Sequence, residues 1–134
     1  MENKCVIIID ETLATGRIAN ASVILAMSLG KEHPSIVGQD LVNASGNSHS
    51  GITTEAIPVL KGGEKLNQLR EKARDLEGLT VIDVNSGTSC TRSYEEYAKK
   101  LATLEEKDIE YYGVGLYGPK KLVNKLTGSL GVLR

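Results

Sequence analysis

The chain has 134 residues, of which 40% are hydrophobic and 25% charged, and these values are typical of one soluble globular domain spanning residues 1–134. Its formal net charge is −1 and its pI is about 6.1, which excludes the broad basic surface of a DNA-binding domain. It has no Phe and no Trp, so Leu, Ile, Val and Ala must build the core, and five Tyr are the only aromatic platforms for a nucleic-acid base.

Strands and helices are expected to alternate along the first half of the chain. Residues 5–9 (CVIII) form a continuous β-branched run, which is typical of a strand buried on both faces. Thr15 is a candidate cap for a helix over residues 16–29. Residues 38–51 are polar and loop-like. Residues 53–60 predict a strand, and Pro58 places that strand at an edge or a bulge.

The second half continues the alternation. A helix is predicted over residues 64–76 and a buried strand over residues 79–84, followed by the polar turn NSGTSC. Ser93 and Glu96 form a capping box for a helix over residues 93–104. The last strand and helix are expected over residues 111–116 and 119–128, the helix beginning near Pro119. This order predicts a single α/β layered domain with all four helices packed on one sheet.

No signal peptide and no apolar run of membrane-spanning length is found, so we expect a cytoplasmic protein that does not bind membranes. Cys5 and Cys90 are then reduced thiols. A nucleophilic role for Cys90 is disfavoured because no His is linked to it by the sequence. His33 and His49 are too few for a metal site, and we expect neither a metal nor a cofactor.

The closing segment GVGLYGPKKLVNKLTGSLGVL, residues 113–133, resembles the C-terminal signature of type II peptidyl-tRNA hydrolases. The opening segments KCVIII and TGRIANAS resemble the first strand and the start of the first helix of that family. The whole chain is also similar to a bacterial domain family of unknown function that shares this fold. The resemblance implies a mixed, mostly parallel sheet of four or five strands with helices on both faces. It also suggests a homodimer.

Most of the catalytic residue types of the hydrolases are absent from the matching positions of this sequence. Gly16 and Arg17 match the glycine and the basic residue of the first helix, but Ala21 and Ile24 stand at the positions of its Gln and His. The acidic residue of the second signature corresponds to Asn85, and an amide cannot act as a general base. The resemblance therefore predicts that the protein is not an active peptidyl-tRNA hydrolase. It disfavours tRNA as a partner without excluding it, and peptidyl-tRNA stays open as the substrate of an alternative hydrolase.

Polar side chains follow three of the predicted strands. Ligands bind at the carboxyl ends of parallel strands in open α/β sheets, so these side chains meet if the three strands are parallel. The candidate catalytic residues are Asp10, Arg17, Asn85 and Ser89. The candidate ligand-binding residues are Thr15, Gly16, Ser86, Gly87, Thr88, Tyr117, Gly118, Lys120 and Lys121. Together they predict a polar, cationic pocket for a small anionic or carbonyl-bearing ligand.

Plainer explanations stay open for each of these residues. Asp10 can cap a turn, Arg17 and Lys120 can be solvated surface cations, and NSGTSC can be an ordinary turn. Two classes of function remain. One is a hydrolase of an ester or amide, in which Asp10 or Asp83 activates a hydroxyl in the pocket. The other is a binding module that has lost catalysis. In either case we expect Lys120 or Lys121 to line the same cleft as Arg17.

Overall fold

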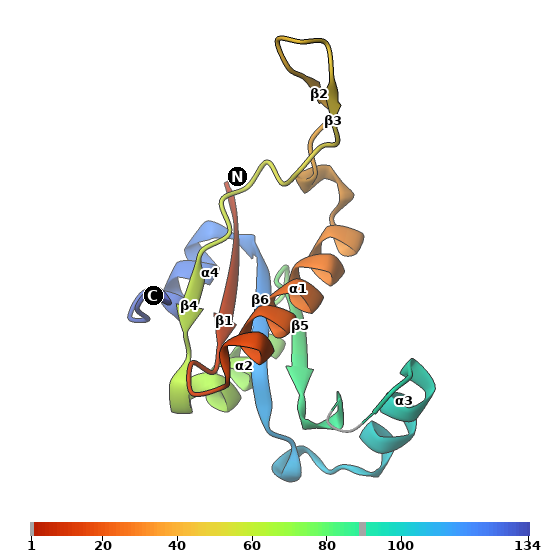
Figure 1. The fold of residues 1–134 in the computed structure, drawn as a ribbon. Coiled ribbons are helices and arrows are strands. Elements are labelled where there is room, and N and C mark those ends of the chain that lie inside the picture. Colours follow the sequence, from red (N-terminus) through yellow and green to blue (C-terminus); the bar gives the residue numbers. More distant parts are fainter. Residues whose placement is uncertain (1, 89–90) are drawn as a thin grey trace.

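Strand β1 (Asn3–Ile9) forms the buried centre of the computed structural model, which describes residues 2–88 and 91–134. All five residues from Cys5 to Ile9 are buried, as the β-branched run predicted. β1 pairs in parallel with β4 (Val59–Lys61) and antiparallel with β6 (Tyr111–Pro119). β5 (Thr80–Asn85) pairs antiparallel with β6 (Figure 1). The sheet order is therefore β4-β1-β6-β5.

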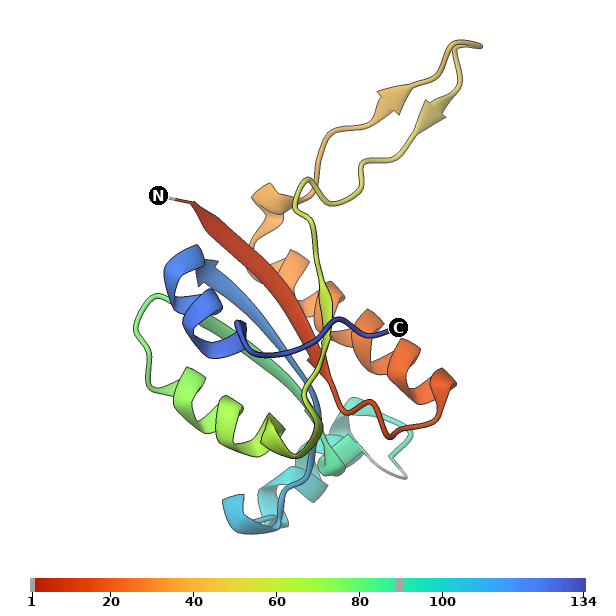
Figure 2. The same cartoon turned by 90° about the vertical axis from the view of Figure 1, so that its left-hand side faces the viewer.

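Helices cover both faces of this sheet, as the resemblance implied. α1 (Thr15–Glu32) lies on one face, and α2 (Leu66–Arg74) and α4 (Lys120–Thr127) lie on the other (Figure 2). Alternation along β1 supplies the two cores: Ile7 and Ile9 pack on the α1 side, and Val6 and Ile8 pack on the α2 and α4 side. The mixed four-stranded α/β fold is thus confirmed.

The expectation of a mostly parallel sheet is wrong, because only the β1–β4 pair is parallel. The reason lies in α3 (Tyr94–Thr103), which connects β5 to β6 and has no buried residue. α3 lies beside the sheet, against the 3₁₀ turn Ser86–Thr88, rather than on it as predicted. A helix that does not cross over a face of the sheet cannot return the chain to a parallel strand, so β6 runs back antiparallel to β5.

Glycines in β6 let α1 approach the sheet closely. A Cβ at Gly113 would lie 2.9 Å from Ile9 Cδ1 and 3.0 Å from Leu25 Cδ1, and a Cβ at Gly115 would lie 3.0 Å from Leu29 Cδ1. Leu25 and Leu29 are buried in the space that these glycines leave. The α1 wall of the site described below is positioned by this contact.

The segment expected to be a polar loop forms a protruding hairpin, which we call the arm (residues 37–54). It contains β2 (Leu41–Val42) and β3 (Ser48–His49), and it projects from the body beyond the end of α1 (Figure 1). Gly46 has a φ of 86° in its turn, a conformation that favours glycine. The strand predicted over residues 53–60 shortens to β4, which follows Pro58 at the border of the sheet.

Two of the predicted helix starts can be compared directly with the structure. Ser93 caps α3, since its Oγ accepts a hydrogen bond from Glu96 N at 3.1 Å. The prediction for α1 is wrong, because Ala14 is the cap residue and Thr15 is already helical without a side-chain cap. The remaining helices are short 3₁₀ turns, at Pro34–Ile36, Gly63–Lys65 and Glu106–Asp108.

Cys5 predicts a loss of stability at alkaline pH. Burial, with a smaller contribution from the charge of Glu55, raises the pKa of the Cys5 thiol from 9.0 to about 11. Between these values the folded state keeps a proton that the unfolded chain has lost, so stability is complete below pH 9 and falls as pH rises. We expect Cys5 to contribute a loss of about 2–3 kcal/mol in this range.

Urea denaturation at pH 8 to 11 measures this effect. Cys5→Ala should be less stable at every pH because it leaves a cavity, but its stability should fall less steeply with pH. An identical pH slope in both proteins would show that the thiol does not titrate as proposed.

Candidate functional site

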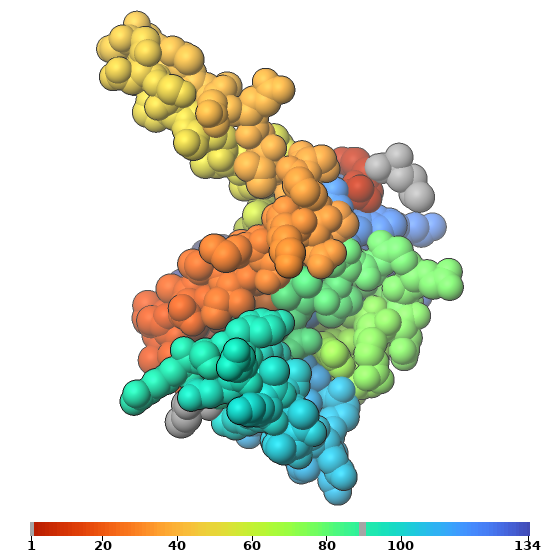
Figure 3. All heavy atoms as spheres, turned by 90° about the vertical axis from the view of Figure 1, so that its right-hand side faces the viewer, coloured from red at the N-terminus to blue at the C-terminus, as the bar shows by residue number. Residues whose placement is uncertain are grey.

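A cavity of about 990 Å³ lies at the end of the sheet where β1 and β5 finish. One wall is α1 from Gly16 to Ser28, and the other is formed by Thr88 and by residues 91–97 at the start of α3. Ile82, Asp83 and Val84 of β5 line the cavity between these walls. Figure 3 views the molecule from this side and shows α3 next to α1. We call this cavity the α1–α3 cleft. Its volume suits a small-molecule ligand.

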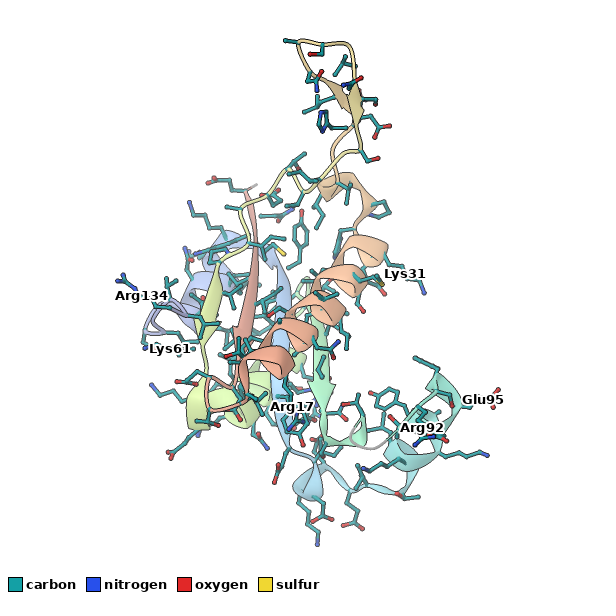
Figure 4. All side chains as sticks on the ribbon, viewed as in Figure 1. Arg17, Lys31, Lys61, Arg92, Glu95 and Arg134 are labelled. Carbon is teal, nitrogen blue, oxygen red and sulfur yellow. The ribbon has the colours of Figure 1, made fainter. Side chains whose placement is uncertain are left out.

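Two arginines line the cleft on opposite walls (Figure 4). Arg17 lies on α1, and Arg92 immediately precedes Ser93, the N-cap residue of α3. The Arg17 guanidinium lies 4.9 Å from the centre of the Tyr112 ring, a distance typical of a cation–π contact. Within residues 2–88 and 91–134, neither guanidinium forms an ion pair with a carboxylate. The cleft therefore holds positive charge that the neighbouring acidic residues do not neutralise.

Three of the five tyrosines line the same cleft: Tyr94, Tyr97 and Tyr112. Tyr94 and Tyr97 meet edge to face with their ring centres 5.8 Å apart. Tyr112 enters through a β-bulge, because Val84 pairs with Gly113 and Asn85 pairs with Tyr111. Bulges re-aim side chains in this way next to binding sites. The cleft thus combines aromatic surface with cations.

Asn85 organises the turn at the end of β5 and is not among the residues that line the cleft. Its side chain is 2% exposed, and its Oδ1 accepts a hydrogen bond from Gly87 N at 2.8 Å. Its Nδ2 donates to Asp83 Oδ1 at 2.6 Å and to the Tyr97 hydroxyl at 3.3 Å. Both ends of the amide are therefore used to hold the turn and Tyr97 in place.

Asp83 belongs to a network of charges on the opposite side of the sheet. Its Oδ2 lies 3.5 Å from Arg70 Nε, and Arg70 Nη1 lies 3.1 Å from Glu106 Oε1. Glu106 also accepts a hydrogen bond of 2.5 Å from the Tyr111 hydroxyl. Burial, followed by this hydrogen bond, raises the pKa of Tyr111, whereas the charge of Arg70 opposes the increase. Asp83 thus shares the charge of Arg70 with Glu106.

Only part of the predicted site lies in the cleft. Gly16, Arg17 and Thr88 line it, together with Asp83. Ser89 lies outside the described residues. Four other candidates point elsewhere or serve the backbone: Asp10, Thr15, Ser86 and Gly87.

The plainer explanations hold for two of these four residues. Asp10 Oδ1 accepts hydrogen bonds from Thr12 N at 2.9 Å and Thr12 Oγ1 at 2.6 Å, so it caps a turn. Ser86 Oγ accepts a hydrogen bond from Glu110 N at 3.1 Å and joins the two strand ends. Neither oxygen is aimed at the cleft.

The prediction that Lys120 or Lys121 shares a cleft with Arg17 is wrong. Because β6 is antiparallel to β1, Gly118 pairs with Lys4, and Pro119 with Asn3, at the opposite end of the sheet.

Lys120 Nζ lies 3.7 Å from Glu2 Oε2, and both lysines line a separate hollow of about 340 Å³. Tyr117 is not among the residues that line this hollow. It packs against His33, with ring centres 4.3 Å apart, and its hydroxyl accepts a hydrogen bond from Asn3.

Sequence reasoning missed most of the second wall of the cleft. Arg92, Tyr94, Tyr97 and Tyr112 were not candidates, although the first three flank a helix start that the capping box had located. Four of the five tyrosines fall within residues 94–112 of a chain without Phe or Trp, and this clustering was the available signal.

An acidic residue in place of Asn85 should destabilise this protein. In Asn85→Asp a second carboxylate replaces the amide that donates to Asp83 Oδ1, so two acceptors face each other. We expect a loss of about 1–3 kcal/mol at pH 7. Urea denaturation measures it, with Asn47→Asp in the exposed arm as the control. A fully stable Asn85→Asp variant would contradict the structural role given to the amide.

No group of three or more His, Cys, Asp or Glu among the described residues is arranged to hold a metal ion. No helix in residues 2–88 and 91–134 combines the length and apolar character of a membrane span.

Comparison with known proteins places the chain in a family. A solved structure of a protein of unknown function from Agrobacterium tumefaciens strain C58 has a TM-score of 0.91, covering 100% of this chain and 99% of that one at 16% identity. That likeness establishes a shared fold. A comparison with curated proteins finds no match. Residues 3–134 match the family described as protein of unknown function (DUF2000). The chain therefore belongs to the DUF2000 family.

Proposed function

We propose that this protein binds a small anionic molecule with a planar or apolar portion in the α1–α3 cleft. Arg17 and Arg92 would contact the anion, and Tyr94, Tyr97 and Tyr112 would contact the remainder of the ligand. The observation that carries the proposal is the presence, in one cavity, of two arginines without carboxylate partners among the described residues. Guanidinium groups suit carboxylates and phosphates because they donate parallel hydrogen bonds.

Titration with phenyl phosphate, inorganic phosphate and benzyl alcohol tests this proposal. Phenyl phosphate carries both a ring and an anion, and the other two probes carry one each. We expect phenyl phosphate to bind most tightly by isothermal titration calorimetry, and its affinity to fall as salt is added. Equal affinity for benzyl alcohol, or no binding of any of the three, would overturn the proposal.

A binding role is better supported than hydrolysis of peptidyl-tRNA or of another ester or amide. A hydrolase needs a base beside its nucleophile. Asp83 is held by Arg70 and Asn85, and Asp10 is held by Thr12. Thr88 Oγ1 and Thr91 Oγ1 donate to backbone carbonyls rather than to a carboxylate. The likeness to type II peptidyl-tRNA hydrolases stays a proposal that rests on the sequence motifs.

We also propose that the partner of the arm is a second copy of this chain. Every residue from 39 to 50 is exposed, and a hairpin with two-residue strands is marginally stable on its own. Leu41, Val42 and Ile52 are 71%, 69% and 79% exposed. The second large apolar surface is on α1, where Val23 and Met27 are 60% and 74% exposed.

These two surfaces suit each other. Residues 18–30 of α1 carry no charged residue, and the only acidic or basic residues of the arm are Asp40 and His49. The apolar side chains of the arm are matched by an uncharged apolar helix face, and a two-fold arrangement would form this contact twice. The arm of each copy would then cover the outer face of α1 in the other.

Leu41→Lys combined with Val42→Lys should convert this dimer into a monomer, because both lysines would be buried in the contact. Size-exclusion chromatography with light scattering measures the mass. Ser45→Lys combined with Asn47→Lys, at the turn of the same arm, is the matched control and should remain dimeric. A wild-type protein that stays monomeric at high concentration would contradict the proposal.

A further inference from the structure

The two edge strands of the sheet, β4 and β5, differ in whether their outer backbone groups are hydrogen-bonded. At the β4 edge, the C-terminal segment runs alongside the strand (Figure 2). Lys61 N donates to Gly131 O at 2.8 Å, and Leu133 N donates to Val59 O at 2.8 Å. The backbone groups of β4 are thus satisfied by an extended piece of the same chain.

The β5 edge has no such cover. Thr80–Asn85 pairs with β6 on one side, and within the described residues no other hydrogen bond reaches the N–H or C=O groups of residues 80–84. The edge opens into the α1–α3 cleft, where Ile82, Asp83 and Val84 form part of the lining. An edge with free donors and acceptors is a template for another extended chain.

The charges indicate which chain would fit. Pairing of β5 with β5 of a second copy would bring two Asp83 side chains close together, and like charges across a strand pair are destabilising. An acidic segment meets two cations instead, because Arg17 and Arg92 line the same cleft. Charge complementarity therefore favours an acidic peptide over a second copy.

We infer that the open edge of β5 binds an extended peptide segment that adds to the sheet as a fifth strand, with a peptide carboxylate at Arg17 and Arg92. This inference rests on the proposed function and names the ligand class for the same cleft. Main-chain hydrogen bonds to β5 would supply affinity, as in other cases of strand addition. The carboxylate would come either from the C-terminus of the peptide or from an acidic side chain.

Four synthetic peptides separate these possibilities. The parent is acetyl-Thr-Val-Thr-Val-Thr with a free carboxylate, and the second peptide is its C-terminal amide. The third is the amide with Glu in the last position. The fourth is the parent with both Val nitrogens methylated, which keeps the charge and removes donors to β5. Binding is measured by calorimetry, and protection of the β5 amides is measured by hydrogen exchange.

We expect the parent peptide to bind and to slow exchange in β5. Methylation should weaken binding about tenfold or more, which corresponds to one or two net backbone hydrogen bonds. If the amide does not bind and Glu does not rescue it, the carboxylate comes from the C-terminus. If Glu restores binding to the amide, the carboxylate comes from an acidic side chain. Equal binding of the methylated peptide, or binding without protection of β5, would overturn the inference.

Phenyl phosphate keeps this test separate from the proposed function. If phenyl phosphate binds in the cleft and the peptides do not protect β5, only the fifth-strand inference fails. If neither phenyl phosphate nor any peptide binds, the proposed function fails with it. Protection of β5 that increases with protein concentration, without peptide, would show that a second copy occupies the edge and would also overturn the inference.

Discussion

Replacing Leu25 with alanine is expected to lower the free energy of unfolding by about 2–5 kcal/mol. Leu25 is 0% exposed on the sheet-facing side of α1. Its Cδ1 fills the space above Gly113, a residue that has no side chain to move into a cavity. Since the neighbouring backbone is held in β6, the hole left by the missing atoms should collapse only in part.

Val23→Ala is the matched control, because Val23 lies on the outer face of the same helix and is 60% exposed. It should change stability by at most about 0.5 kcal/mol in the monomer. Urea denaturation of both variants at pH 7, at a concentration where the protein is monomeric, makes the comparison. Equal stability of Leu25→Ala and the wild type would show that α1 does not pack on the sheet as described.

Charge reversal at Arg17 should weaken binding of phenyl phosphate about tenfold to a hundredfold. Arg17 is exposed and contacts the Tyr112 ring, so Arg17→Glu removes a cation from the cleft with little effect on folding. Arg92→Glu should have a similar effect from the opposite wall. The double variant should lose detectable binding.

Lys121→Glu makes the same change of charge at the other end of the sheet and is the control. It should bind phenyl phosphate about as well as the wild type does, apart from a small long-range effect that salt removes. If Lys121→Glu weakens binding as much as Arg17→Glu does, the anion does not bind specifically in the cleft.

Local sequence patterns predicted the elements well, because each depends on neighbouring residues. The run at Cys5–Ile9 had to be buried on both faces, and Ser93 with Glu96 marked the start of α3. The direction of β6 was not predictable in this way. It depends on whether α3 packs on the sheet, and a short helix with a weakly apolar face does not reveal where it will lie.

Because the direction of β6 was predicted wrongly, residues that were expected in one site lie at two opposite ends of the sheet. Arg17, Gly16 and Thr88 were found because they follow β1 and β5, whose carboxyl ends do meet. Lys120 and Lys121 follow β6 and so lie at the opposite end. Tyr112 was missed for a further reason: a bulge between Val84 and Asn85 turns it into the cleft, and the bulge arises from pairing between distant strands.

A ¹H–¹⁵N correlation spectrum recorded during titration with phenyl phosphate tests most directly whether the α1–α3 cleft is the binding site. Amides at Gly16, Arg17, Thr91–Tyr94 and Tyr112 should shift together along one saturating curve. Amides at Lys120, Lys121 and Asn124, which line the second hollow, should not. Saturable shifts confined to Lys120–Asn124, or shifts that scatter over the surface without saturating, would contradict a binding site between α1 and α3.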